Sequence, residues 1–181
     1  MIHKVFTITT FALISISFLS FTHIENTTAT VKWYTWEEAV KANEKEQRKI
    51  FVDVYTDWCG WCKQMDKTTF SAPQIAKYLN DDFYAVKLDA EQKEDIKFRE
   101  HIFKFVKQGR RGYHQLAYEL LNGRMSYPTV VVLNEDFARI LIAPGYQKAD
   151  KFKHVLKFAA EEHYKTKTWN DFLKDQEDVE K

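Results

Sequence analysis

From residue 30 onward the apolar residues follow two kinds of pattern, short runs and helical spacing. Together these patterns outline one α/β domain. Short, nearly continuous runs of apolar and β-branched residues predict these strands: 50–55, 83–88, 129–133 and 138–142. Apolar positions at helical spacing predict these helices: 35–48, 63–70, 72–79, 152–159 and 169–173. The last two strands flank a turn-like triplet at 134–136, which indicates an antiparallel hairpin. This order predicts an α/β/α sandwich with a mixed central sheet and helices on both faces.

Two of the predicted helices begin with the signature of a capping box. Thr35 is followed by Glu38, and Ser71 by Gln74, so that a hydroxyl and a longer polar side chain satisfy the first backbone N–H groups reciprocally. Pro73 stands early in the second of these helices, where its fixed φ is favourable.

A longer segment, about 91–122, separates the second predicted strand from the third. Its apolar positions are Ile96, Ile102, Phe103, Val106, Tyr113, Leu116, Ala117, Leu120 and Leu121. Gly109 and Gly112 interrupt this pattern, so we predict two helices on one side of the sheet. Two roles are open for this segment: a cap over the bound substrate, or additional packing of the core. His101 and His114 are expected to be solvated helix residues.

The first 29 residues have the pattern of a targeting segment. Lys4 gives a short positive start, residues 5–21 are free of charge, and small residues at 27–29 suit cleavage. We predict a signal peptide, with an uncleaved N-terminal anchor as the alternative. The domain is then expected at 30–166, followed by a C-terminal helix and tail at 167–181. Export places the protein in the periplasm or outside the cell, where disulfides persist.

The motif with the clearest chemistry is Cys59-Gly60-Trp61-Cys62, at the point where a strand gives way to a helix. The N–H groups of a first helical turn are unpaired and favour a thiolate at Cys59. These are the only cysteines of the chain, so a four-ligand zinc site is disfavoured, and Lys63 stands where a c-type haem motif needs His. A formal net charge of +1 gives no argument for nucleic acid.

The segment 50–63, with its Trp58-Cys59-Gly60-x-Cys62-Lys63 motif, resembles the active-site segment of the thioredoxin superfamily, most closely that of exported bacterial thioredoxin-like proteins. The resemblance extends to Asp53, at the position of a buried acid, and to Tyr127-Pro128-Thr129, similar to the family's cis-proline loop. It covers about 50–133. The chain departs from the family in Trp61, where proline is usual, and in the long segment before Pro128.

This resemblance implies roles for seven residues. Cys59 would be the nucleophile and Cys62 the resolving thiol. Asp53, a carboxyl group within a buried strand, is expected to have a raised pKa and to exchange a proton with Cys62. The substrate would be bound at the residues beside the sulfurs: Trp58, Trp61, Tyr127 and Pro128. Of the two tryptophans, we expect Trp58 to pack back on the domain and Trp61 to stay exposed.

The function expected from these residues is thiol–disulfide exchange on protein cysteines, with no cofactor and no metal. Oxidising members of the superfamily commonly carry His between the cysteines, whereas Trp61 has no charge, so we expect a reductase. A reductase in an oxidising compartment needs a membrane-bound electron donor as a partner. The alternative is a client-binding, chaperone-like module of the same fold in which redox chemistry is secondary. We expect a monomer.

Overall fold

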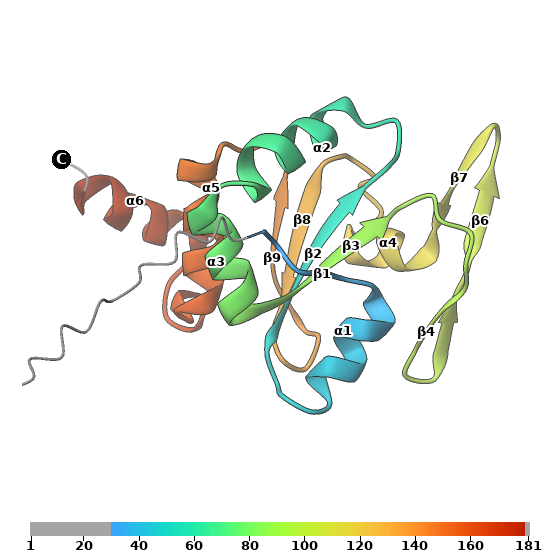
Figure 1. The fold of residues 1–181 in the computed structure, drawn as a ribbon, viewed down its shortest axis with the longest axis horizontal. Coiled ribbons are helices and arrows are strands. Elements are labelled where there is room, and N and C mark those ends of the chain that lie inside the picture. Colours follow the sequence, from blue (N-terminus) through green and yellow to red (C-terminus); the bar gives the residue numbers. More distant parts are fainter. Residues whose placement is uncertain (1–29, 180–181) are drawn as a thin grey trace, which may run out of the picture.

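A computed structural model describes residues 30–179 of the chain, so the predicted targeting segment at 1–29 lies outside the described residues. A five-stranded sheet forms the centre of the molecule (Figure 1). Its strands, in spatial order, are β1 (Trp33–Tyr34), β3 (Phe83–Asp89), β2 (Lys49–Tyr55), β8 (Thr129–Leu133) and β9 (Arg139–Pro144). β1 and β2 run parallel to β3, and β8 and β9 form an antiparallel hairpin beside β2. The predicted mixed sheet and its C-terminal hairpin are therefore confirmed.

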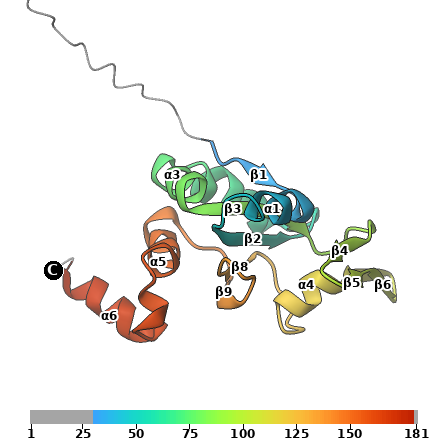
Figure 2. The ribbon, with the colours of Figure 1, turned by 90° about the horizontal axis from the view of Figure 1, so that it is seen from below.

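Helices cover both faces of this sheet (Figures 1 and 2). They are α1 (Trp36–Asn43), α2 (Gly60–Met65), the π-helical η1 (Asp66–Phe70), α3 (Pro73–Asp82), α4 (Gln115–Leu120), α5 (Ala149–Ala160), the 3₁₀ turn η2 (His163–Lys165) and α6 (Trp169–Val179). In the region that the structure describes, no helix is both long and apolar enough to cross a membrane.

The alternation of side chains along β2 divides the core into two halves. Ile50, Val52 and Val54 pack with α1 and α4 on one face, while Phe51 packs with η1, α3 and α5 on the other. Phe51 is fully buried, and its ring contacts four aromatic rings: Trp33, Phe70, Phe83 and Phe152. Since Asp53 is two residues further along the strand, it faces the same side as Phe51, beneath the helix that follows the cysteines.

The predicted pair of helices in the segment 91–122 is wrong for most of its length. The segment forms two hairpins, β4 (Ile96–Phe98) with β5 (His101–Phe103) and β6 (Phe105–Gln108) with β7 (Arg111–His114), and only α4 is helical. The short runs are rich in aromatic and β-branched residues that pair across strands, and Arg99 and Gly109 adopt positive φ at the turns. Cross-strand pairing, together with turns at these two residues, has outweighed the helical spacing of the apolar positions.

Two further predictions, for His114 and for Ser71, also need correction. His114 is fully buried; its Nδ1 accepts the N–H of Leu116 at 3.3 Å and caps α4, and burial lowers its pKa. The capping box predicted at Ser71 is absent, because the Ser71 hydroxyl donates to the Lys67 carbonyl at 2.6 Å and Ala72 is the N-cap of α3. The box at Thr35 and Glu38 is confirmed, with both hydrogen bonds present.

Candidate redox site

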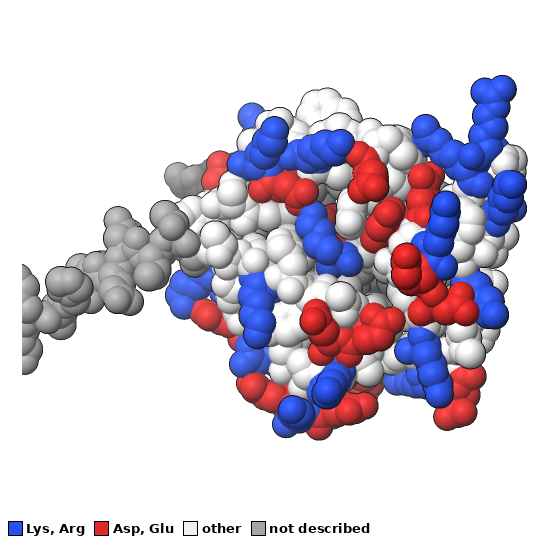
Figure 3. Space-filling model, turned by 45° about the vertical axis from the view of Figure 1, so that its right-hand side comes forward, with Lys and Arg blue, Asp and Glu red and all other residues white. Residues whose placement is uncertain are grey.

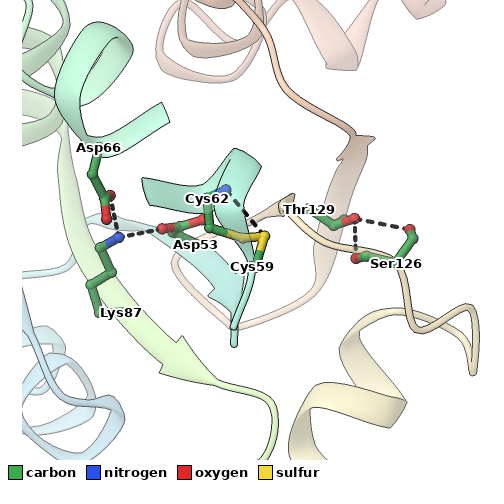
Figure 4. Close-up of a disulfide and its surroundings, with 7 residues drawn as sticks. All are labelled: Asp53, Cys59, Cys62, Asp66, Lys87, Ser126 and Thr129. Atoms are coloured by element: carbon green, nitrogen blue, oxygen red, sulfur yellow. Dashed lines mark hydrogen bonds and ion pairs between the residues drawn. A yellow bond between two sulfur atoms is a disulfide. The ribbon is translucent and has the colours of Figure 1, made fainter. Parts of the chain in front are cut away.

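Cys59 and Cys62 form a disulfide at the start of α2, directly after β2 (Figure 4). Cys59 is the N-cap residue of the helix. Its N–H donates to the Thr56 carbonyl at 3.0 Å, and its Sγ accepts the N–H of Cys62 at 3.1 Å. The sulfur thus takes the place of the oxygen that usually satisfies a free N–H in the first helical turn. The same N–H is positioned to stabilise negative charge on Cys59 after reduction.

Both sulfur-bearing residues are buried, and they differ little in exposure. Cys59 retains 5% of its accessible surface and Cys62 retains 2%. Cys59 is therefore the slightly more accessible of the two, as expected. The helix continues from α2 into η1, so the site stands on a single helical segment that is packed against β2 and β3 through Met65 and Phe70.

Asp53 lies beneath this helix and is 1% exposed. In Figure 4 its carboxyl group points toward Cys62. Its Oδ2 accepts a hydrogen bond from Lys87 Nζ at 2.7 Å, while Oδ1 has no hydrogen-bond partner among the described residues. Burial raises the pKa of Asp53 from 3.8 to about 6 despite the opposing effect of Lys87. The expected burial and raised pKa of this acid are both present.

Lys87 was not singled out from the sequence as a site residue. It is the direct neighbour of Asp53 in the parallel register of β2 and β3, and it also contacts Asp66 of η1. Its ammonium group lies 4.8 Å from the centre of the Trp33 ring and 5.0 Å from that of Tyr55. The Phe70 ring follows at 5.5 Å. Burial alone would lower the pKa of Lys87, but the charges and hydrogen bonds of Asp53 and Asp66 outweigh burial, so its pKa is raised.

The loop before β8 contains the cis peptide bond between Tyr127 and Pro128. Thr129 anchors this loop by donating its hydroxyl to the Ser126 carbonyl at 2.8 Å, and the Pro128 carbonyl accepts the N–H of Gly145 at 2.8 Å (Figure 4). In the part of the chain that the structure describes, no hydrogen bond engages the backbone N–H or C=O of Tyr127. These two groups are available to an added strand.

The two tryptophans next to the cysteines differ in their surroundings. Trp58 is 51% exposed, but its Nε1 donates to Glu91 Oε2 at 3.1 Å and its ring meets Tyr127 edge-on at 5.9 Å. The guanidinium group of Arg111 lies 4.1 Å from the centre of the same ring. Trp61 is 63% exposed, and the one aromatic ring that it contacts within residues 30–179 is that of Tyr146, at 5.3 Å. Trp58 is therefore packed on one side, whereas Trp61 offers a more open apolar surface.

Sequence reasoning missed Glu91 and Arg111 as neighbours of the site. Both belong to the segment 91–122, in which two helices were expected, and hairpin β6–β7 brings Arg111 to Trp58. Burial, followed by the charges of Glu91 and Asp89, raises the pKa of Tyr127 to about 12, so this phenol stays protonated. The motif around the cysteines gave no signal for these contacts, because they depend on how a distant hairpin folds.

The sheet order, the helices on both faces and the disulfide at the start of α2 define a thioredoxin-fold protein with a Cys-x-x-Cys pair. Residues 17–180 match the family model Thioredox_DsbH, which is described as a protein of unknown function, DUF255. The chain belongs to this family. The expected thioredoxin fold is confirmed, and the protein is similar to thiol–disulfide oxidoreductases.

Solved structures support the fold. A structure titled "DsbH Oxidoreductase" is 17% identical with a TM-score of 0.53, and the match covers 74% of this chain and 87% of that one. A thioredoxin-fold protein from Helicobacter pylori is 18% identical with a TM-score of 0.56, over 71% and 80% of the two chains. A putative disulphide-isomerase from Bacteroides thetaiotaomicron is 25% identical with a TM-score of 0.51, over 71% and 90%.

Curated relatives match over a shorter stretch. Human spermatogenesis-associated protein 20 is 37% identical over 67 residues, which make up 36% of this chain and 8% of that protein. The thiol:disulfide interchange protein DsbD of Escherichia coli K12 is 33% identical over 60 residues, or 33% of this chain and 11% of DsbD. The match thus spans about a tenth of the length of these relatives.

Proposed function

We propose that this protein is a thiol–disulfide oxidoreductase that reduces disulfides of other proteins in the periplasm. The observation that carries the proposal is the position of Cys59, whose sulfur caps a helix and accepts the N–H of Cys62 at 3.1 Å. Such a position lowers the pKa of a thiol, and the thiolate is the form that attacks disulfides. The similarity to the thiol:disulfide interchange protein DsbD supports the same activity class.

The reaction starts from the dithiol form. The Cys59 thiolate attacks one sulfur of the substrate disulfide, which forms a mixed disulfide and releases the other substrate sulfur as a thiolate. Cys62 then loses its proton and attacks the Cys59 sulfur, which breaks the mixed disulfide and releases the second substrate thiolate. The protein is left as the Cys59–Cys62 disulfide, and two electrons have passed to the substrate. A membrane-bound donor must return these two electrons before the next cycle.

Asp53 is the residue that accepts the Cys62 proton in this proposal. Its pKa of about 6 lets it ionise near neutral pH and take up a proton readily. Oδ1, the oxygen without a hydrogen-bond partner among residues 30–179, is available for that proton. The substrate binds at the free backbone groups of Tyr127, beside Pro128, and against the exposed faces of Trp58 and Trp61.

The first experiment is reduction of insulin disulfides with dithiothreitol as the electron donor. We expect the wild type to accelerate the reaction and Cys59→Ser to abolish the acceleration. A Cys62→Ser variant should hold clients as mixed disulfides on Cys59, and identification of these clients would name the substrates. Equal rates for the wild type and Cys59→Ser would refute the enzymatic function.

A client-binding function is favoured by one observation, the exposure of Trp58 and Trp61 beside the disulfide. The variant with both cysteines replaced by serine separates the two functions. Under the redox proposal this variant loses biological function. If it keeps full function and full client affinity, the protein acts as a binding module and its thiols are dispensable.

A further inference from the structure

Hairpin β6–β7 places a groove rich in positive charge next to Trp58, the residue that precedes Cys59. The groove is lined by Glu91, Lys93, Phe105, Lys107, Arg110, Arg111 and Gly112. Four of these side chains are cationic and one is anionic. In Figure 3 basic side chains gather at the end of the molecule where this hairpin lies.

The four cations of the groove are not paired with any carboxylate in the part of the chain that the structure describes. Between residues 30 and 179, no ion pair involves Lys93, Lys107, Arg110 or Arg111, and all four side chains are exposed. The one acid of the groove, Glu91, accepts a hydrogen bond from Trp58. What distinguishes these cations from other exposed lysines, such as Lys41 and Lys45, is that all four line one groove beside Trp58.

An aromatic ring of the hairpin, that of Phe105, also lines the groove. A Cβ atom at Gly112 would come within 2.3 Å of Phe105 Cζ and 2.4 Å of the Val106 carbonyl oxygen, so the Phe105 ring lies directly over the glycine. The ring provides an apolar floor between the cationic side chains. Arg111 joins this groove to the redox site, because its guanidinium group stacks on Trp58 at 4.1 Å.

On the basis of the proposed function, we propose that hairpin β6–β7 is a docking arm that selects substrate proteins with acidic residues near the reactive disulfide. An acidic, extended segment that lies in the groove would find four unpaired cations and an apolar floor. Its disulfide would then be presented at Trp58 and Cys59. Charge complementarity of this kind acts mainly on the rate of association and weakens with salt.

The test compares three synthetic peptides with the same intramolecular disulfide, flanked by a run of Asp, Asn or Lys. The reduced protein is mixed with each peptide at low ionic strength, and the rate constant for peptide reduction is measured. We expect the Asp peptide to react about tenfold faster than the Lys peptide. Lys107→Glu/Arg110→Glu should abolish that preference while leaving the Asn peptide within about twofold of the wild-type rate. High salt should bring the three rates together.

A matched control carries the same change of charge at the other end of the domain. Lys41 and Lys45 are exposed and lie at the C-terminal end of α1, before the start of β2, whereas the cysteines follow its end. Lys41→Glu/Lys45→Glu should keep the preference for the Asp peptide. If the reversed hairpin variant does not fold, as judged by circular dichroism, Lys107→Gln/Arg110→Gln takes its place with the same expectation.

The outcomes separate this inference from the function on which it rests. If the wild type reduces no peptide faster than Cys59→Ser does, the proposed function fails. If it reduces all three peptides at one rate, the docking arm fails and the redox function stands. A third outcome is that the hairpin variant loses binding to phosphatidylglycerol vesicles but keeps the peptide preference. The groove would then be a membrane contact, which overturns the proposal.

Discussion

Replacement of Asp53 by Asn should make the stability of the protein less sensitive to pH in one defined window. Burial of Asp53 raises its pKa to about 6, whereas the same carboxyl group in the unfolded chain has the ordinary value of 3.8. At a pH between these two pKa values, the carboxyl group of Asp53 is ionised in the unfolded chain but still protonated in the folded protein. The folded state of the wild type is therefore progressively destabilised as the pH rises through this window.

The size of the effect follows from the two pKa values. A difference of about two pH units corresponds to about 3 kcal/mol of unfolding free energy once the pH exceeds 6. Below pH 4 the carboxyl group is protonated in both states and the effect vanishes. Asp53→Asn carries no titrating group at this position. Its stability relative to the wild type should therefore rise by about 2 to 3 kcal/mol between pH 4 and pH 8.

Urea unfolding of the disulfide form at several pH values measures this difference directly. Asp136→Asn serves as the control, because Asp136 is an exposed residue of the β8–β9 turn. Its difference from the wild type should stay nearly constant over the same range. A constant difference for Asp53→Asn as well would show that Asp53 ionises equally in both states, and its proposed role as a proton acceptor near neutral pH would lose its basis.

Three further predictions concern the surroundings of this residue and the redox potential. Lys87→Ala leaves Asp53 without its cation and should lower the unfolding free energy at pH 7 by about 3 kcal/mol, with recovery when Asp53→Asn is added; urea unfolding of the double-mutant cycle measures both. Phe51→Ala removes a fully buried ring with four aromatic neighbours and should cost about 3 to 5 kcal/mol in the same assay, whereas a loss below about 1 kcal/mol would contradict the packing described. Because Trp61 places no charge between the cysteines, the potential measured in glutathione buffers should lie closer to about −270 mV than to −120 mV, and a value above about −180 mV would rule out the reductase.

The sequence predicted the redox segment well because its signals are local. A buried strand, a Cys-x-x-Cys pair and a helix follow one another within residues 50–70, and each has its own pattern. The hairpin β8–β9 was equally clear, since Asn134 and its neighbours separate two apolar runs. In these places local preference and the final fold agree, so the strands and helices were found close to their true ends.

The segment 91–122 was mispredicted because its local signals conflict. Its apolar residues fit a helical period on either side of the break at 109–112, yet they also alternate within runs of three or four residues. Cross-strand pairs such as Ile96 with Phe103 decide between the two, and they appear only once a turn at Arg99 has brought the strands together. Glu91 and Arg111 could not be predicted as neighbours of Trp58 for the same reason, as they come from this segment.

The pairing of Asp53 with Lys87 shows how the core determines the chemistry of the site. The two residues lie opposite each other because β2 and β3 are in a register that pairs Phe51 with Ala85, on the face that η1, α3 and α5 cover. A shift of one residue would turn Lys87 to the opposite face of the sheet and leave Asp53 without a cation. Hydrophobic packing around Phe51 therefore fixes the register, the register places Lys87, and Lys87 limits how far burial can raise the pKa of Asp53.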